Sequence, residues 1–497
     1  MLVSRDRGDW ALRANLLSAV TALGLAALSA SAAAPTFDPA PWLDDLAQAK
    51  DAFANKYANL EWAQLDADPR LADLIAQTEA RLRAAGSDAD ARAAFDRLAR
   101  SLGDGHVRID WPAPPQPATA STVSTPDTCI NYVPSHAAAP LAGQALGYQP
   151  LATPQSAVFP AGVIPVGRQR VGVLKIGLFG PHATPAYCHA AAAALHIAEG
   201  KPCDGVCADL IDHWASVRMT EDFAAQIEAL KSAGAGVLLV DVAGNGGGSE
   251  WAETAARMLT PIRIAAEPLG FVRGPHWTRK LAALELALRG FAKTASSPDR
   301  TELLRLADQA GAAKAVAETR CDSAPLWAGA RPACAWLGGG LWATGLLASA
   351  DPTALRGKPW AGLVFHAAEV PYREGVWQGP LIVLVDRWTG SAAEEFAAEL
   401  QDNHAALLMG EATYGAGCGH TDGGTPTRLT HSGATLELPD CARLRADGSN
   451  EVRGVVPDLL VGFHKSDNAR LKTADFLARL PDALAALPRF TVRSPAP

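Results

Sequence analysis

Ser391 is the residue whose type and setting point most directly to chemistry. It follows Gly390 in a turn between a continuous apolar run at 380–385 and a segment whose apolar residues repeat at helical spacing from Ala392. A hydroxyl at the start of a helix lies among free backbone N–H groups, and the helix dipole there favours negative charge. This setting suits a serine nucleophile that forms an oxyanion intermediate. A serine that only caps the helix is the commoner explanation of such a segment taken alone.

A glycine-rich turn is the second candidate element. Residues 236–242 form another buried apolar run, and they lead into Ala243 and then a turn at 244–248 that holds four glycines and Asn245. Glycines let the backbone approach a ligand closely and direct N–H groups into a cleft. A tight turn without a ligand is the alternative, and a dinucleotide loop is set aside because the spacing does not match G-x-G-x-x-G. Together with Ser391 the turn predicts an oxyanion hole, with the N–H groups of Gly247 and Ala392 as donors.

These residues require an α/β layer to position them. The sequence predicts a strand at 170–179, a helix at 221–233, the strand at 236–242 and a helix at 251–259, an order typical of a sheet that binds ligands at its strand ends. Helical patterns between 42 and 102 predict a small bundle that ends in a turn at 103–106. A stretch rich in Pro, Ala, Ser and Thr at 111–167 indicates a connection with a few short strands.

Composition and the N-terminus predict a globular protein that is exported. The 497 residues suggest two to three domains, with 48% hydrophobic and 19% charged residues. Basic residues, an apolar stretch at 16–28 and an A-x-A site predict a signal peptide cut after Ala32, which is favoured over an anchor because the stretch is short. Three arginines and two aspartates leave with it, a net +1, so the formal charge of −8 becomes −9. This charge argues against nucleic acid or an anionic membrane as partner, and no later segment approaches transmembrane length.

The eight cysteines all lie beyond the predicted signal peptide and fit an oxidising compartment. Their spacing suggests local disulfides within 188–207, between Cys321 and Cys334, and between Cys418 and Cys441. Zinc binding at Cys203 and Cys207, with His189 nearby, is the less favoured alternative. The spacing does not give the connectivity.

Four segments resemble, in order, those of the C-terminal-processing (tail-specific) serine peptidases and their tricorn-type and interphotoreceptor-retinoid-binding-protein relatives. These segments are the strand and turn at 241–248, the serine segment at 383–394, the G-E-x-T-[FY]-G strand at 409–415 and the closing G-V-x-P-D at 454–458. The resemblance implies a ClpP/crotonase-like α/β core with an N-terminal helical bundle domain. It also implies a peptide or protein substrate and no metal or organic cofactor.

The resemblance and the element pattern together predict the domain organisation. After the signal peptide (1–32) we expect a helical domain at 38–105, a connection at 106–168, a peptidase core at 169–463 and a C-terminal helical tail at 464–497. The connection lacks the carboxylate-binding loop of a PDZ module. Insertions at 181–217 and 261–378 interrupt the core, and the length of the second predicts a cover over the active site.

The chain departs from the processing-protease pattern at the position of the catalytic lysine. That residue follows T-[FY]-G in the family and is Ala416 here, so Ser391 needs another base. The tricorn-type branch implies a histidine and a glutamate, which match His106 and Glu451, with Asp104 considered for orienting the histidine. His420 is the reserve base.

The sequence therefore predicts a secreted or periplasmic serine endopeptidase that works through an acyl-enzyme with a Ser–His rather than a Ser–Lys pair. The alternative is a catalytically inactive ligand- or peptide-binding protein on the same fold, which the missing lysine favours. The sequence does not indicate the oligomeric state.

Overall fold

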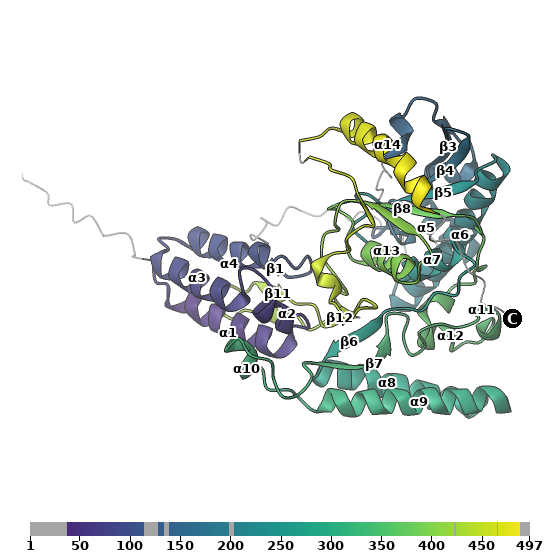
Figure 1. Ribbon diagram of the computed structural model, residues 1–497. Helices are drawn as coiled ribbons and strands as arrows, with labels where there is room; N and C mark the ends of the chain where they lie inside the picture. Colours follow the sequence, from purple (N-terminus) through teal and green to yellow (C-terminus); the bar gives the residue numbers. More distant parts are fainter. Residues whose placement is uncertain are drawn as a thin grey trace, which may run out of the picture.

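A seven-stranded mixed sheet forms the centre of the computed structural model, which describes residues 37–113, 128–133, 139–197, 203–421, 424–464 and 466–487 (Figure 1). The predicted signal peptide lies outside these ranges. The strand order is β13-β9-β8-β5-β4-β3-β2, parallel from β4 to β13 and antiparallel between β2, β3 and β4. The strands are β2 (Gln149–Pro150), β3 (Ala161–Val166), β4 (Gln169–Lys175), β5 (Val237–Asp241), β8 (Leu381–Val385), β9 (Leu407–Gly410) and β13 (Leu459–Leu460).

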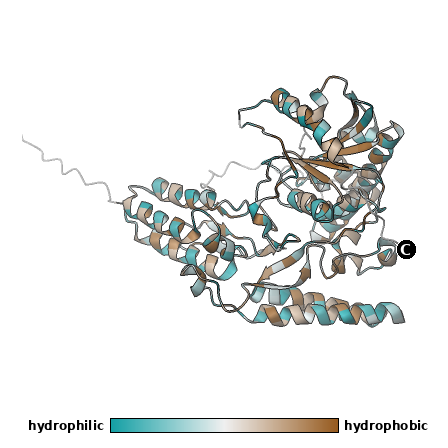
Figure 2. Ribbon diagram, viewed as in Figure 1, coloured by the Kyte–Doolittle hydropathy of each residue, from teal (hydrophilic) through white to brown (hydrophobic). Residues whose placement is uncertain are grey.

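The central strands are apolar because both of their faces are covered. Leu238 and Val240 of β5 pack into the core that includes α6 (Gly205–Ser232), α7 (Trp251–Met258) and α13 (Ala392–Asp402). Val237 and Leu239 face the opposite side, where α14 (Ala469–Ala486) packs. Figure 2 shows the resulting band of hydrophobic strands. A continuous apolar run is what a strand buried on both faces requires.

The strands and helices that the sequence predicts around the site are confirmed. Strands β4, β5 and β8 and helices α7 and α13 lie where the patterns place them. The predicted helix at 221–233 is only the last part of α6, which begins at Gly205 after Asp204. The Asp204 side chain accepts from Cys207 N–H and caps the helix. The predicted insertion at 181–217 therefore contains the first part of this helix, and it also contains α5 (Pro185–Ala194).

Four helices precede the sheet, as the sequence predicts: α1 (Ala40–Lys56), α2 (Leu60–Leu65), α3 (Leu71–Ala84) and α4 (Asp88–Leu102). Their core also takes in Leu429, Leu436 and Leu438 from a much later part of the chain. Strand β1 (Arg108–Asp110) follows the helices and pairs with β11 (Thr435–Glu437), which pairs with β10 (Thr427–Arg428). The helices and the C-terminal half of the chain thus form one continuous structure.

The long segment before β8 contains its own sheet and a helical hairpin. Strand β6 (Pro268–Val272) lies between β7 (Leu337–Trp342) and β12 (Cys441–Arg443). Helices α8 (Pro275–Ala292) and α9 (Ser297–Glu318) pack against each other and lie apart from α13 (Figure 1). The segment meets the region around Ser391 through β6, which pairs with the strand that carries Arg443.

Four disulfides join Cys129–Cys188, Cys203–Cys207, Cys321–Cys334 and Cys418–Cys441. The prediction of disulfides is confirmed, and both sulfurs of Cys203 and Cys207 are used by their mutual bond rather than by zinc. The bond from Cys188 spans 59 residues, so it is not local as the spacing suggested. Among the residues described, no helix combines the length and apolarity that crossing a membrane requires.

Candidate active site

Ser391 lies where two neighbouring strands end. Strands β5 and β8 are adjacent and parallel, so the glycine-rich turn after β5 and the turn after β8 emerge side by side at one edge of the sheet. Ser391 is the N-cap of α13, with φ 54° and ψ −123°. A side chain at positive φ is uncommon and strained, and such strain concentrates at functional sites. The conformation resembles the sharp strand-to-helix turns that expose a serine nucleophile.

Gly247 packs directly against Ser391. Its φ is +116°, and a Cβ at this position would lie 2.7 Å from Ser391 Cβ and 3.0 Å from Ala392 N, so only glycine fits. The Gly247 N–H donates to Asn245 Oδ1 at 2.9 Å, which engages one of the two predicted oxyanion donors in this conformation. The other, Ala392, is the first residue of α13, where a helix leaves its N–H without an intrahelical acceptor.

Glu394 joins the serine to the strand-end segment that follows β9. Its buried carboxylate accepts from Ser391 N–H at 3.0 Å and from Gly415 and Ala416 N–H at 2.6 and 2.8 Å. It also accepts from Thr413 Oγ1 and from Gly417 N–H. An acidic side chain in the first turn of a helix commonly complements the helix dipole. In the structure Glu394 also holds residues 413–417 against the start of α13 through these hydrogen bonds.

His106 contacts the same segment from the other side. Its Nδ1 lies 2.7 Å from the carbonyl oxygen of Ala416, so the residue that replaces the family's lysine holds the predicted histidine. The ring also lies over Gly419, where a Cβ would approach Nε2 to 2.8 Å at a φ of +81°. Asp104 does not orient the ring as considered, because its carboxylate accepts from the backbone N–H of His106 at 2.9 Å.

The Ala416 contact determines the tautomer of His106. A carbonyl oxygen can only accept, so Nδ1 carries the proton and the lone pair of the neutral ring is on Nε2. Burial lowers the pKa of His106 below its usual 6.5, and the nearby His420 and Arg443 lower it further. The Ala416 hydrogen bond and the Glu394 charge act in the opposite direction. The ring is therefore neutral near pH 7, as a general base must be.

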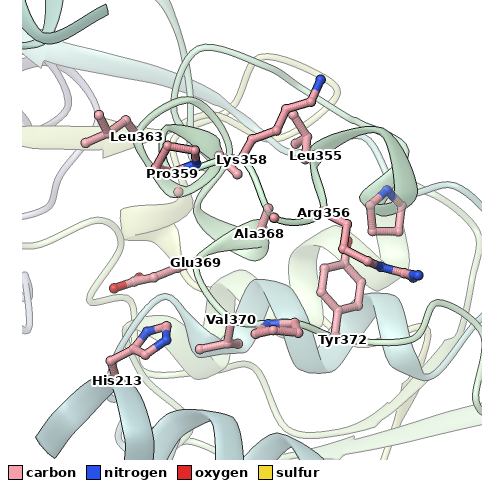
Figure 3. Close-up of a pocket in the computed structure, with 15 residues that line it drawn as sticks. His213, Leu355, Arg356, Lys358, Pro359, Leu363, Ala368, Glu369, Val370 and Tyr372 are labelled. Atoms are coloured by element: carbon pink, nitrogen blue, oxygen red, sulfur yellow. The ribbon is translucent and has the colours of Figure 1, made fainter. Parts of the chain in front are cut away.

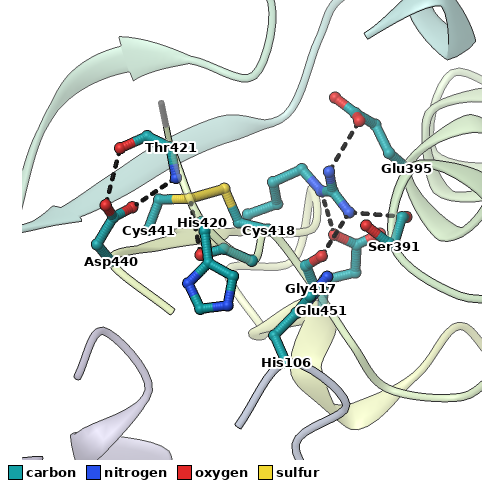
Figure 4. The surroundings of a disulfide bond; sticks show 12 residues. His106, Ser391, Glu395, Gly417, Cys418, His420, Thr421, Asp440, Cys441 and Glu451 are labelled. Carbon is teal, nitrogen blue, oxygen red and sulfur yellow. Dashed lines mark hydrogen bonds and ion pairs between the residues drawn. A yellow bond between two sulfur atoms is a disulfide. The ribbon is translucent and has the colours of Figure 1, made fainter. Parts of the chain in front are cut away.

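His420 lies beside His106 rather than in its place. The two rings meet edge to face with centroids 5.7 Å apart (Figure 4). His420 Nδ1 contacts the Leu438 carbonyl oxygen at 3.1 Å, and its Nε2 lies 3.7 Å from a carboxylate oxygen of Glu437. Both nitrogens thus have partners on the side of β11.

Glu451 lies under the serine and reaches it through Arg443. The fully buried Glu451 carboxylate forms an ion pair with Arg443 Nε, and Arg443 Nη1 donates to Glu395 at 2.8 Å. Arg443 Nη2 donates to the carbonyl oxygens of Ser391 and Gly417, both at 2.9 Å. Figure 4 shows Glu451, Glu395, Ser391 and Gly417 gathered around these contacts. Glu451 therefore supports the backbone of Ser391 rather than the histidine ring.

Several buried carboxyl groups surround Arg443. Burial raises the pKa of Glu451 to about 7 although Arg443 opposes the shift, and the Glu394 charge raises it further. Burial also raises the pKa of Glu395. One guanidinium faces several carboxyl groups, and taking each charge out of water is expensive. These buried carboxyl groups therefore bind protons more tightly than exposed carboxyl groups do.

Sequence reasoning missed Arg443 and the hub role of Glu394. Arg443 belongs to a short strand, β12, without a motif of its own, and it bonds to the carbonyl oxygen of Ser391 from 52 residues further along the chain. The acidic residue at the third helical position after a serine is a capping-box pattern, which does signal that Glu394 accepts from Ser391 N–H.

A cavity of about 570 Å³ opens elsewhere on the molecule, between α6 and the segment 352–372. Figure 3 shows His213, Arg356, Glu369, Val370 and Tyr372 among its lining residues. None of the predicted site residues lines it. The serine site is instead a set of adjoining turns at the sheet edge.

Comparison with known proteins gives a family and a fold. Residues 328–461, which contain Ser391 and Glu451, match the model of peptidase family S41. The crystal structure of mature CPAF is similar at a TM-score of 0.55 and 14% identity, over 91% of this chain and 98% of that one. At this identity the likeness shows a shared fold.

Two further structures are similar at lower TM-scores. A putative peptidase from Parabacteroides merdae aligns over 92% of this chain and 98% of its own, with 13% identity and a TM-score of 0.44. The photosystem II D1 C-terminal processing protease covers 88% of this chain and 96% of its own, with 16% identity and a TM-score of 0.32. The family match supports the predicted C-terminal-processing peptidase family, and the fold shared with mature CPAF agrees with the predicted α/β core.

Proposed function

We propose that this chain, of which residues 328–461 match the model of peptidase family S41, is a serine peptidase that cleaves peptide bonds with His106 as its base. The observation that carries the proposal is the contact between His106 Nδ1 and the Ala416 carbonyl. It brings a histidine to the segment from which the lysine is missing and leaves Nε2 as the basic nitrogen.

In the proposed reaction Ser391 Oγ attacks the scissile carbonyl carbon while its proton moves to His106 Nε2. The carbonyl oxygen becomes an oxyanion, which the free N–H of Ala392 stabilises. Gly247 N–H becomes the second donor when it leaves Asn245 Oδ1. The imidazolium then gives its proton to the leaving amine, and the acyl-enzyme forms. A water molecule, deprotonated by His106, hydrolyses this ester and restores the serine.

In this proposal Glu451 does not contact the reacting atoms and acts through Arg443. With Arg443 it fixes the Ser391 carbonyl and hence the strained backbone that presents the hydroxyl. A misplacement of about 1 Å can reduce a rate 100-fold, so a rigid support of this kind matters for catalysis. Export through the predicted signal peptide to the periplasm or outside the cell belongs to the same proposal, and four disulfides are consistent with it.

A fluorophosphonate probe tests the proposal, since it labels an activated serine. We expect labelling of the wild type, none of Ser391→Ala, and a rate about 100-fold or more lower in His106→Ala. The matched control is His420→Ala, which removes the neighbouring ring and leaves the base.

The outcomes separate the alternatives. Equal labelling of His106→Ala and the wild type, with a loss in His420→Ala, would transfer the role of base to His420. A folded wild type that never labels would favour the inactive binding protein on this fold.

A further inference from the structure

Two exposed aromatic side chains lie at the rim of the candidate site. Among the described residues, large hydrophobic side chains that are exposed are mostly aliphatic, and Trp388 and Tyr414 are the two aromatic ones, at 59% and 52% exposure. Their rings stack, with centroids 6.5 Å apart and planes 25° from parallel. Two large aromatic rings that are exposed to solvent next to each other indicate a binding surface.

The pair is continuous with the proposed catalytic residues. Trp388 belongs to the turn between β8 and Ser391. Tyr414 belongs to the segment that Glu394 holds, and its N–H donates to the Thr389 carbonyl at 2.9 Å. A Cβ at Gly105 would meet the Tyr414 ring at 2.3 Å, so this ring lies against the turn that carries His106. Tyr414 thus borders both the His106 turn and the Ser391 turn, where a Cβ at Gly390 would lie 3.6 Å from Tyr414 Cβ.

The backbone beneath the rings is fixed although the rings are exposed. Asp386 Oδ1 accepts from Trp388 N–H at 3.0 Å and from Gly244 N–H at 2.8 Å, which joins this turn to the glycine-rich one. Thr389 Oγ1 donates to the Val242 carbonyl at 3.1 Å. A rigid aromatic surface loses little conformational entropy on binding, which is why Trp and Tyr dominate contact sites.

The chemistry of the rim favours an apolar ligand. The charged neighbours in sequence are already engaged. Arg387 and Glu411 form an ion pair with each other, and Asp386 accepts from backbone N–H groups. An aromatic side chain can stack on the exposed rings, and a large aliphatic one can cover them.

We propose that Trp388 and Tyr414 form a substrate subsite that binds an aromatic or large aliphatic side chain flanking the scissile peptide bond. The inference rests on the proposed peptidase function, because it takes the substrate to be a peptide held at Ser391. It adds a preference at the cleavage site that the catalytic residues do not impose.

Cleavage-site profiling tests the subsite. The wild type, Trp388→Ala, Trp388→Phe and Tyr414→Leu digest a mixed synthetic peptide library, and mass spectrometry identifies the cleaved bonds. We expect wild-type cleavage enriched for Phe, Tyr, Trp or Leu beside the bond, and an enrichment about tenfold lower in Trp388→Ala. Trp388→Phe keeps the stack and retains the preference, while Leu286→Ala, which removes a more exposed apolar side chain on α8, leaves it unaltered.

Several results would overturn the subsite. A wild type that a fluorophosphonate labels but that shows no such enrichment, or that prefers Lys or Arg beside the bond, refutes the subsite and leaves the peptidase in place. An enrichment that persists in both Trp388→Ala and Tyr414→Leu does the same. A wild type that neither labels nor cleaves removes the proposed function, and the subsite falls with it.

Discussion

At the scale of single residues, the histidine is held by a carbonyl instead of a carboxylate. A carboxylate partner would stabilise the imidazolium and raise the pKa of His106, whereas the neutral Ala416 carbonyl does so weakly and burial dominates. The proposed base is thus less basic than a free histidine. It is correspondingly active at lower pH, because the neutral form persists there.

The pH dependence of labelling follows from this shift. Only neutral His106 accepts the serine proton, so the rate of fluorophosphonate labelling rises with pH and levels off with a midpoint below 6.5. Burial raises the pKa of Glu451 to about 7, so titration of Glu451 could also change the labelling rate in this pH range. The control is therefore Glu451→Gln, which we expect to label more slowly with the same midpoint. A midpoint at or above 7 that disappears in this variant would assign the step to Glu451.

The residues of this site differ in how far sequence could predict them. Ser391 follows from a buried strand, a glycine and a helix start, all of which are local patterns. His106 and Glu451 required the family resemblance, since neither lies near Ser391 in the chain. The hydrogen bond from Gly247 N–H depends on the conformation of the Asn245 side chain, which the sequence pattern does not specify.

At the scale of elements, helices α7 and α13 meet through buried charges. Arg257 of α7 forms ion pairs with Glu253 of the same helix and with Glu399 of α13, and all three side chains are almost fully buried. Burial raises the pKa of Glu253 to about 8 and that of Glu399 to about 7, in spite of the arginine. The helical spacing of apolar residues predicts both helices. The same spacing would lead one to expect an apolar interface between them, not buried charges.

These shifts predict a stability that falls as pH rises. A carboxyl group with a raised pKa in the folded state binds its proton more tightly in the folded protein. Its contribution to the free energy of unfolding is therefore complete below about pH 4.5 and is lost as the pH rises through about 8. Glu253→Gln mimics the protonated group and should weaken this dependence, with a gain of about 1–3 kcal/mol over the wild type at pH 9. Urea unfolding between pH 5 and 9 measures it. The exposed Glu369→Gln is the control, and an equal slope in Glu253→Gln and wild type would contradict the shift.

At the scale of the whole molecule, the N-terminal helices and the sheet together build the site. His106 follows α4, while Ser391 and Glu451 come from the other end of the chain. Sequence patterns predict the bundle and the α/β core separately. Their union depends on the packing of residues 429–438 into the helical core and on the pairing of β1 with β11, which are contacts between distant segments. Local periodicity carries no information about either contact.

One asparagine joins the two parts at the site itself. Buried Asn59, at the start of α2, donates through Nδ2 to Asp104 Oδ2 at 2.9 Å and accepts through Oδ1 from Asn450 Nδ2 at 2.8 Å. Asp104 holds the backbone of His106, and Asn450 directly precedes Glu451. Asn59 thus sets the histidine turn relative to the glutamate turn.

Replacing Asn59 therefore has two expected effects. Asn59→Ala leaves buried polar groups of Asp104 and Asn450 without this partner, so the free energy of unfolding falls by about 1–3 kcal/mol. The fluorophosphonate labelling rate falls as well, by about tenfold, when it is measured at a temperature at which the variant is fully folded. The matched control is Asn55→Ala on α1, whose amide bonds to Asp51 and Arg320 at the surface. We expect that control to change stability by less than about 0.5 kcal/mol and to label normally. A folded Asn59→Ala that labels at the wild-type rate would show that the α/β core positions His106 without the helices.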